Sequence, residues 1–262
     1  MIDSSKYGPW AVIAGGSEAV GAEFAHQLAR AGLNLLLIAR KEGPLEETAE
    51  AVRQHGTEVR TLSQDLVAPD AVAAIAAATA DLEVGLLVLN AGANTYGHEF
   101  VTGDLEAFRA VATLNIDRKL ELTHLLGRPM AERGRGGIII VGSVTGFVGC
   151  EVMSVYSASK AFSRVFAEGL WLEMKGRGVD VLALTAGPTR TPAMQRAGLD
   201  FDAAGIVASD PADVAREGLE HLADGPVWVV GEHYEKARTL SGFPRRNQVL
   251  AEAAAVREMM GA

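Results

Sequence analysis

The 262-residue sequence has a single cysteine, Cys150, and this scarcity limits the kinds of protein to which it can belong. One thiol cannot form an internal disulfide, so a small disulfide-stabilised secreted domain is excluded and a reducing compartment is expected. No apolar run approaches the roughly 20 residues that a membrane-spanning helix needs. The opening residues, Met-Ile-Asp-Ser-Ser-Lys, lack the apolar stretch of a signal peptide. We therefore expect a cytoplasmic protein.

Basic side chains are also in deficit, with 24 Lys and Arg against 33 Asp and Glu and a net charge of −9. This balance disfavours nucleic acid or an anionic membrane as a partner. The six histidines are scattered without the spacing of metal ligands, so no metal site is predicted. The sequence shows no linker, charge block or internal repeat, and 48% of its residues are hydrophobic. These features predict one large α/β domain spanning residues 1–262.

Short apolar runs alternate with helical patterns, an order typical of a parallel sheet with crossover helices. The expected strands cover residues 10–14, 34–39, 59–63, 86–89, 137–142, 179–185 and 227–230. The expected helices cover residues 20–31, 45–55, 70–80, 105–133, 154–177 and 211–222. This order predicts a doubly wound seven-stranded sheet with helices on both faces. Residues 190–208 exceed an ordinary turn and are expected to form a substrate loop. The tail, residues 232–262, is expected to end in a helix that either lies on the surface or covers the site or a neighbouring subunit.

Tyr156 and Lys160 lie four residues apart in the segment Tyr-Ser-Ala-Ser-Lys. On a helix this spacing places the phenol and the ammonium on one face, roughly 6 Å apart along the axis. Because a nearby cation favours the phenolate, we expect Lys160 to lower the pKa of Tyr156 from its ordinary value near ~10. Such a phenol can exchange a proton with an alcohol or carbonyl oxygen. A pair at this spacing is by itself more often part of an ordinary exposed helix.

A glycine-rich turn, Ala14-Gly15-Gly16-Ser17-Glu18-Ala19-Val20-Gly21, follows the first expected strand. Between a strand and a helix, such a turn lets backbone N–H groups meet a pyrophosphate, although a plain tight turn is the alternative. The second strand ends in Ala39-Arg40-Lys41, where an NAD-preferring site usually has a carboxylate. Arg40 there favours the 2′-phosphate of NADP(H), and NAD(H) stays possible. Glu18 would oppose a phosphate, and a solvated loop is the alternative for the two cations.

These motifs occur in a particular order: the glycine-rich turn, Asp65-Leu66, Asn90-Ala91-Gly92, Asn115, Ser143, Tyr156-x-x-x-Lys160 and Gly187-Pro188-Thr189-Arg190-Thr191. With this order the chain resembles the short-chain dehydrogenase/reductase family over about residues 8 to 231. The resemblance implies a Rossmann-type fold and NAD(P)-dependent chemistry on a CH–OH group. It also implies a homodimer or homotetramer built on the catalytic helix and the last strand.

The resemblance assigns roles to four residues. Tyr156 would be the general acid in reduction and the general base in oxidation. Lys160 would stabilise the phenolate and hold the nicotinamide ribose. Ser143 would hydrogen-bond the substrate oxygen. Asn115, within a long expected helix, would hold a local kink and a water that leads protons from Lys160 to solvent; an exposed polar position is the alternative.

The resemblance also implies a set of cofactor contacts. They are Gly15, Ser17, Glu18, Val20, Gly21, Arg40, Lys41, Asp65, Leu66, Asn90, Ala91, Gly92, Tyr156, Lys160, Gly187, Thr189 and Thr191. One departure from the family pattern stands among them, because Ala19 occupies the position of the middle glycine of the turn. A negative φ at Ala19 would cost little, whereas a positive φ would weaken cofactor binding.

Two functions remain open from the sequence. The first is an NADP(H)-dependent oxidoreductase that interconverts a secondary alcohol and a ketone on a moderately hydrophobic small molecule. Its expected loop offers an apolar pocket wall through Met194, Leu199, Phe201, Ile206 and Val207. The second is a catalytically weak dinucleotide-binding module with a sensing or partner-binding role. A serine hydrolase is disfavoured because Gly142-Ser143 lacks the second glycine of the nucleophile elbow. Cys150 is expected to be a buried, inert thiol.

Overall fold

A computed structural model describes residues 2–192, 194, 201 and 207–260. Its seven strands form one parallel sheet in the order β3-β2-β1-β4-β5-β6-β7. The strands are β1 (Trp10–Ala14), β2 (Asn34–Ala39), β3 (Val59–Ser63), β4 (Val84–Leu89), β5 (Gly136–Ser143), β6 (Val179–Ala186) and β7 (Val227–Val229). The predicted doubly wound sheet is therefore confirmed, with each predicted strand in place and its ends shifted by at most two residues.

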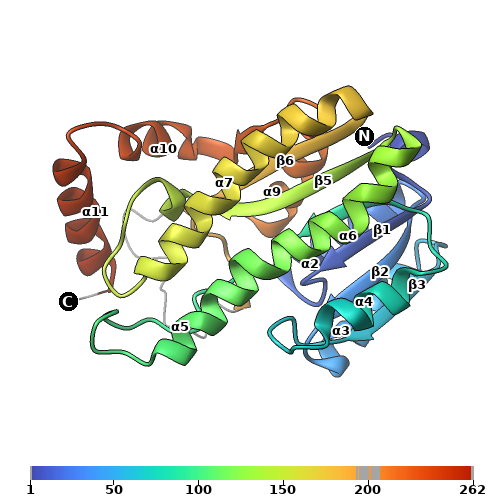
Figure 1. Cartoon of the computed structure of the whole chain (residues 1–262), viewed down its shortest axis with the longest axis horizontal. Coiled ribbons are helices and arrows are strands. Elements are labelled where there is room, and N and C mark those ends of the chain that lie inside the picture. Colours follow the sequence, from blue (N-terminus) through green and yellow to red (C-terminus); the bar gives the residue numbers. More distant parts are fainter. Residues whose placement is uncertain (1, 193, 195–200, 202–206, 261–262) are drawn as a thin grey trace.

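Helices cover both faces of the sheet, which explains why the central strands are apolar throughout. On one face lie α2 (Ala19–Arg30), α3 (Glu42–Arg53) and α9 (Pro211–Glu220). On the other lie α4 (Ala71–Thr79), α6 (Arg118–Arg133) and α7 (Ser154–Met174), of which α6 and α7 cross the near side in Figure 1. Successive residues of a strand point to opposite faces of the sheet. Ile13 therefore packs in the core under α2, α3 and α9, and Val12 packs in the core under α4, α6 and α7.

The predicted helix 105–133 is wrong in its middle. The structure has α5 (Leu105–Ala112), then a π-helical turn (Thr113–Asp117), then α6. The Asn115 side-chain Nδ2 donates to the Val111 carbonyl oxygen at 2.9 Å, which is the acceptor that the backbone N–H of Asn115 would use in an α-helix. Further along, the Arg118 N–H bonds to the Thr113 carbonyl, five residues back. The kink predicted at Asn115 is thus a π-turn, a feature frequent at functional sites.

The remaining elements lie at the ends of the chain and between strands. A short helix, α1 (Ser4–Tyr7), was not predicted; it is capped by Asp3, whose carboxylate accepts from Ser5 N at 2.9 Å. Short 3₁₀ turns cover Val144–Phe147, Lys175–Arg177 and Gly231–His233. The tail forms α10 (Tyr234–Leu240) and α11 (Arg245–Met260), so its predicted helix is present. Within the expected substrate loop, residues 193, 195–200 and 202–206, including Leu199 and Ile206, lie outside the described residues. Among the helices described, none combines the length and the apolar character needed to cross a membrane.

The sheet order gathers the predicted site at one edge. β1 pairs with β2 on one side and with β4 on the other, and Ala14 at its end lies opposite Ile38 and Leu89. Because all the strands are parallel, the turns that follow them open on the same edge, and the change of direction beside β1 forms the crevice typical of ligand binding. The glycine-rich turn, Arg40 and Asn90 all follow these strands directly.

Candidate active site

Three of the four predicted catalytic residues meet where β5 ends and α7 begins. Ser143 is the last residue of β5, and its hydroxyl lies close enough to that of Tyr156 on α7 to lower the pKa of the phenol. The Ser143 Oγ also accepts from Thr145 Oγ1 at 3.0 Å, which orients the serine hydroxyl. Lys160 lies one turn after Tyr156, with its Nζ 5.3 Å from the centroid of the tyrosine ring. The local order strand, 3₁₀ turn, helix therefore brings a hydroxyl pair and an amine into one place.

The expected effect of Lys160 on the Tyr156 phenol is wrong for this structure. Burial raises the pKa of Tyr156 to about 12, and the hydrogen bond from Ser143 offsets only part of that increase. Lys160 lies over the ring face, and it is not among the groups that set the pKa of the phenol. Desolvation disfavours the charged phenolate and wins over the distant cation. The helix spacing correctly placed the two residues on one face, but it did not reveal how dry the site is.

Lys160 is itself deeply buried, with 3% of its surface exposed. Its Nζ donates to the Val141 carbonyl oxygen at 3.3 Å. Burial lowers the pKa of Lys160 to about 8, because desolvation penalises the ammonium. The amine therefore gains and loses its proton slightly above neutral pH, within the pH range in which many enzymes work.

Asn115 faces the same small space as Lys160. Its Nδ2 also donates to the Ala93 carbonyl oxygen at 3.1 Å, while its buried Oδ1 has no hydrogen-bond partner among the described residues. A Cβ at Gly92 would lie 2.7 Å from that Oδ1 and 3.0 Å from the Lys160 Nζ, so only glycine fits there. An unsatisfied buried acceptor next to an ammonium is a site that a water molecule can complete.

The glycine-rich turn is held against its neighbouring strands by backbone hydrogen bonds. Gly15 N donates to the Ile38 carbonyl oxygen at 2.8 Å, and the Asn90 amide donates to the Gly15 carbonyl oxygen at 2.8 Å. Gly15 has a φ of +89°, and a Cβ at Gly21 would lie 1.8 Å from the Gly15 carbonyl oxygen. The turn thus needs glycine at both positions and presents bare backbone and the start of α2, as a dinucleotide pyrophosphate requires.

Ala19 adopts the conformation that the sequence left undecided. Its φ is +49°, in the left-handed region, although it carries a Cβ. Ala19 is the first residue of α2, and Glu18 before it is extended and makes no side-chain cap. The neighbouring Val20 is buried in the core, so any cofactor contact there comes from its backbone.

The predicted adenosine end of the site is more exposed. Arg40 and Lys41 are exposed after β2, and Lys41 lies at the N-terminal boundary of α3. The Asp65 carboxylate accepts from Val67 N at 2.9 Å and closes a turn after β3, whereas Leu66 is buried in the core. Ser17 lies in the glycine-rich turn, where its carbonyl oxygen accepts from Thr48 Oγ1 at 2.8 Å. Ala91 is half-buried just after β4.

The segment after β6 also reaches this edge. Thr189 Oγ1 donates to the Gly187 carbonyl oxygen at 3.1 Å, and Thr191 Oγ1 accepts from Met194 N at 3.2 Å. A Cβ at Gly187 would lie 2.2 Å from the Nε2 of His233, a residue that the sequence did not single out. His233 is buried behind this loop, and burial lowers its pKa. Its only sequence signal is its place shortly after the last strand.

The tail is anchored to the segment between Ser143 and Tyr156. Arg245 Nη2 donates to the Phe147 carbonyl oxygen at 2.7 Å, and Arg257 forms an ion pair with Glu151. Cys150 is buried under this contact beside Leu240, and burial raises its pKa, as expected for an inert thiol. The tail therefore packs on the loop that precedes the catalytic helix.

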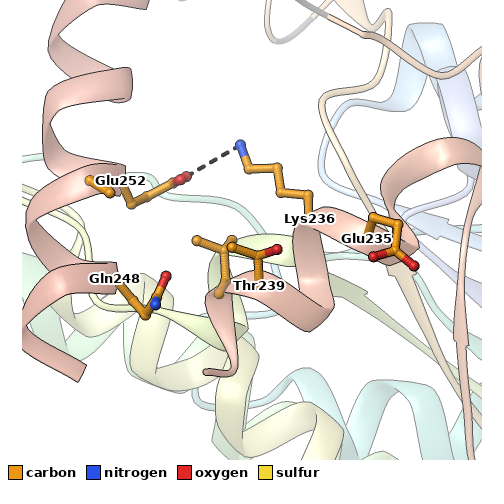
Figure 2. Close-up of a pocket in the computed structure, with 7 residues that line it drawn as sticks. Glu235, Lys236, Thr239, Gln248 and Glu252 are labelled. Carbon is orange, nitrogen blue, oxygen red and sulfur yellow. Dashed lines mark ion pairs between the residues drawn. The ribbon is translucent and has the colours of Figure 1, made fainter. Parts of the chain in front are cut away.

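A cavity of about 350 Å³ opens between α10 and α11 (Figure 2). Lys236 and Glu252 span it, with 3.5 Å between the Lys236 Nζ and a Glu252 carboxylate oxygen. None of Ser143, Tyr156 and Lys160 lines it. In the part of the chain that the structure describes, no group of three or more His, Cys, Asp or Glu side chains is placed to hold a metal ion.

Comparison with known proteins gives a consistent picture. The family model described as short chain dehydrogenase matches residues 9–200. A 7β-hydroxysteroid dehydrogenase of Clostridium sardiniense is 31% identical over 248 residues, which cover 94% of this chain and 95% of that protein. A structure solved for insight into 7β-hydroxysteroid dehydrogenase stereoselectivity has a TM-score of 0.90 at 26% identity and covers 96% of this chain and 99% of its own. A short-chain dehydrogenase from Sphingobium yanoikuyae in complex with NADPH has a TM-score of 0.79 at 31% identity, with 87% and 89% covered.

Proposed function

The chain belongs to the short-chain dehydrogenase family, and from this premise we propose that it interconverts a secondary alcohol and a ketone with NADP(H). The observation that carries the proposal is the approach of the Ser143 hydroxyl to that of Tyr156, with the Lys160 Nζ over the tyrosine ring. A hydroxyl pair in a dry pocket can hold one substrate oxygen and exchange a proton with it.

The residues take the following roles. Ser143 donates a hydrogen bond to the substrate oxygen, and the Thr145 hydroxyl that donates to Ser143 fixes its orientation. Tyr156 gives its proton to that oxygen in reduction and takes it back in oxidation. Lys160 supplies positive charge beside the ring, and the free acceptor of Asn115 holds the water through which the site exchanges protons with solvent.

The cofactor fits the residues at the crevice. The bound nicotinamide supplies the hydride in reduction and accepts it in oxidation. The backbone of the glycine-rich turn would hold the pyrophosphate, since a Cβ at Gly21 would collide with the Gly15 carbonyl oxygen. Gly92, Asn90, Gly187 and Thr189 would line the nicotinamide end. We assign NADP(H) over NAD(H) because Arg40 is exposed at the end of β2 and no acidic residue stands there to hold a ribose 2′-hydroxyl.

The proposed substrate is a bulky hydrophobic carbonyl compound or the corresponding secondary alcohol. Of the expected loop, Phe201 is described and buried, and its ring lies 5.5 Å from the Arg190 guanidinium carbon. The 7β-hydroxysteroid dehydrogenase that covers nearly the whole chain makes ring hydroxysteroids and oxosteroids the first compounds to test. A homodimer or homotetramer remains the proposed assembly, and sedimentation at micromolar concentration tests it.

The proposed function is tested by NADPH oxidation with a panel of carbonyl compounds. The panel should contain oxosteroids, bulky aryl ketones and free ketose sugars. Wild-type protein should reduce a hydrophobic member of the panel, and Tyr156→Phe should lose at least about a thousandfold in kcat while it still binds NADPH. If both proteins bind NADPH and neither reduces any compound, the chain is a dinucleotide-binding module, and the strained turn at Ala19 becomes part of the reason.

A further inference from the structure

Lys119 on α6 is a buried amine that the proposed chemistry does not use. Only 1% of its surface is exposed, and its Nζ donates to the Val141 carbonyl oxygen at 3.1 Å and to Ser163 Oγ at 3.0 Å. No described carboxylate contributes to its pKa or to that of Lys160. An ammonium buried without a counter-charge is costly, so the charge state of Lys119 requires an explanation.

The second amine that reaches this point is Lys160. It donates to the same Val141 carbonyl oxygen at 3.3 Å, so the two amines share one acceptor and lie close enough to affect each other's pKa. Val141 lies one residue beyond Ile140, the last residue of β5 that pairs with β4. Two ammonium groups this close in a dry site would repel each other strongly. The pair is therefore expected to hold one proton instead of two.

The hydrogen bonds decide which amine is neutral. An uncharged lysine has two N–H donors and one lone pair, whereas an ammonium has three donors and no acceptor. Lys119 has three neighbours that suit the neutral form, because Val141 and Ser163 accept from it and the Lys160 ammonium is placed to donate to it. Ser163 gives its own proton to the Ser159 carbonyl oxygen at 3.1 Å, so its Oγ is free to accept from Lys119. Lys160, as an ammonium, keeps its third N–H for the site at Tyr156.

We propose that Lys119 is a positioning residue for Lys160: its uncharged amine accepts a hydrogen bond from the Lys160 ammonium and holds that ammonium in place beside Tyr156. Its catalytic consequence rests on the proposed function, because Lys160 acts there through Tyr156. Burial and the neighbouring amine lower the pKa of Lys119 well below its ordinary value. The titratable groups that face the pair are Tyr156 and the two lysines themselves; in the described chain, β5 presents the Val141 carbonyl and the π-turn presents Asn115, which is neutral.

The first test measures protons taken up on unfolding, and it needs neither cofactor nor substrate. A lysine that is neutral when folded and charged when unfolded binds one proton on unfolding, which steepens the rise of stability with pH. Between about pH 6 and about pH 7, Lys119→Met should take up close to one proton fewer on unfolding than wild type does. The number of protons is obtained from the pH dependence of the free energy of unfolding, measured in urea at several pH values. Lys175→Met, at an exposed lysine after α7, should match wild type. Equal uptake by wild type and Lys119→Met would mean that Lys119 is charged in the fold and would overturn the proposal.

The second test follows the pH dependence of carbonyl reduction. Without the acceptor at Lys119, the Lys160 ammonium loses a hydrogen bond, so the alkaline fall of kcat/KM should move to lower pH by about one unit in Lys119→Met. If the variant is active and its kcat/KM falls at the same pH as wild type or at a higher pH, the positioning role is overturned. If wild type reduces no carbonyl compound, the proposed function fails while the unfolding result still decides the charge of Lys119. Should Lys119→Met not fold, Lys119→Gln permits the same proton count.

Discussion

The Nζ of Lys160 lies 5.3 Å from the centroid of the Tyr156 ring, where the lysine is buried and the tyrosine is half-buried. The ammonium thus approaches the aromatic face, where it is attracted by the ring electrons. The phenolic oxygen interacts instead with the side chain of Ser143, which lowers the pKa of the phenol. This division explains how a basic and an acidic partner coexist in a site with limited access to solvent, and it leads to a prediction on pH.

Oxidation and reduction should depend on pH in opposite ways. Oxidation needs the Tyr156 phenolate as base, and the phenol has a pKa raised to about 12, so the phenolate is the rare form near neutrality. We expect kcat/KM for alcohol oxidation to rise from about pH 6 to about pH 8, by up to tenfold per unit, and to level off above about pH 8, where Lys160 loses its proton. Reduction uses the phenol and should fall above about pH 8, where Lys160 loses its proton. Initial rates with one alcohol–ketone pair in both directions measure this; an oxidation rate that does not rise would contradict it.

Replacing Ala19 by glycine should stabilise the protein. Its φ of +49° strains a residue with a Cβ, and glycine adopts this conformation freely. We expect Ala19→Gly to raise the free energy of unfolding by about 1 kcal/mol and to lower the Kd of NADPH. The matched control is Ala22→Gly, within the ordinary part of α2, which should lose about 1 kcal/mol. Urea unfolding and NADPH titration of both variants would decide, and a loss of stability in Ala19→Gly would count against strain at this turn.

Reversing the charge of Arg40 should change the choice of cofactor. Arg40 is exposed at the end of β2, where a 2′-phosphate would form a charge-assisted pair with it. Arg40→Asp should weaken NADPH binding by about tenfold and change NADH binding by less than about twofold. Arg177→Asp, at an exposed arginine before β6, carries the same change of net charge and should affect neither cofactor. Fluorescence titration supplies the binding constants; equal losses for NADPH and NADH would mean that Arg40 meets no phosphate.

His233 should make the fold sensitive to acid. Burial lowers its pKa below the ordinary value of 6.5, so the unfolded chain binds a proton that the folded chain does not. The free energy of unfolding should therefore fall as the pH drops below about 6.5, and His233→Gln should lose less than wild type. His124→Gln, at an exposed histidine, is the control and should behave as wild type. Urea unfolding from about pH 7 to about pH 5 tests this; parallel curves for all three proteins would exclude His233 as the acid-sensitive group.

The local features of the site follow from the sequence because they depend on spacing. Tyr156 and Lys160 share a helix face since they are one turn apart. The turn after β1 is rich in glycine because a side chain at Gly15 or Gly21 would collide with the neighbouring backbone. The doubly wound parallel sheet was predictable from the alternation of apolar runs with helical patterns, whereas the spatial order of its strands comes from the structure. Asn115 also predicted a local irregularity, because a side-chain amide within a helix competes for backbone acceptors. The π-turn is that irregularity.

What the sequence by itself determined is therefore the class of fold, the edge at which the motifs gather and the residue types placed there, all of which depend on periodicity and short spacings. Only the tertiary structure decided the pKa of Tyr156, the left-handed φ of Ala19, the position of His233 behind Gly187 and the meeting of Lys119 with Lys160. The physical reason is that desolvation and close contact are set by segments far apart along the chain. The degree to which an amine or a phenol is desolvated depends on the packed core around it. The residues that flank it in the sequence do not indicate this degree.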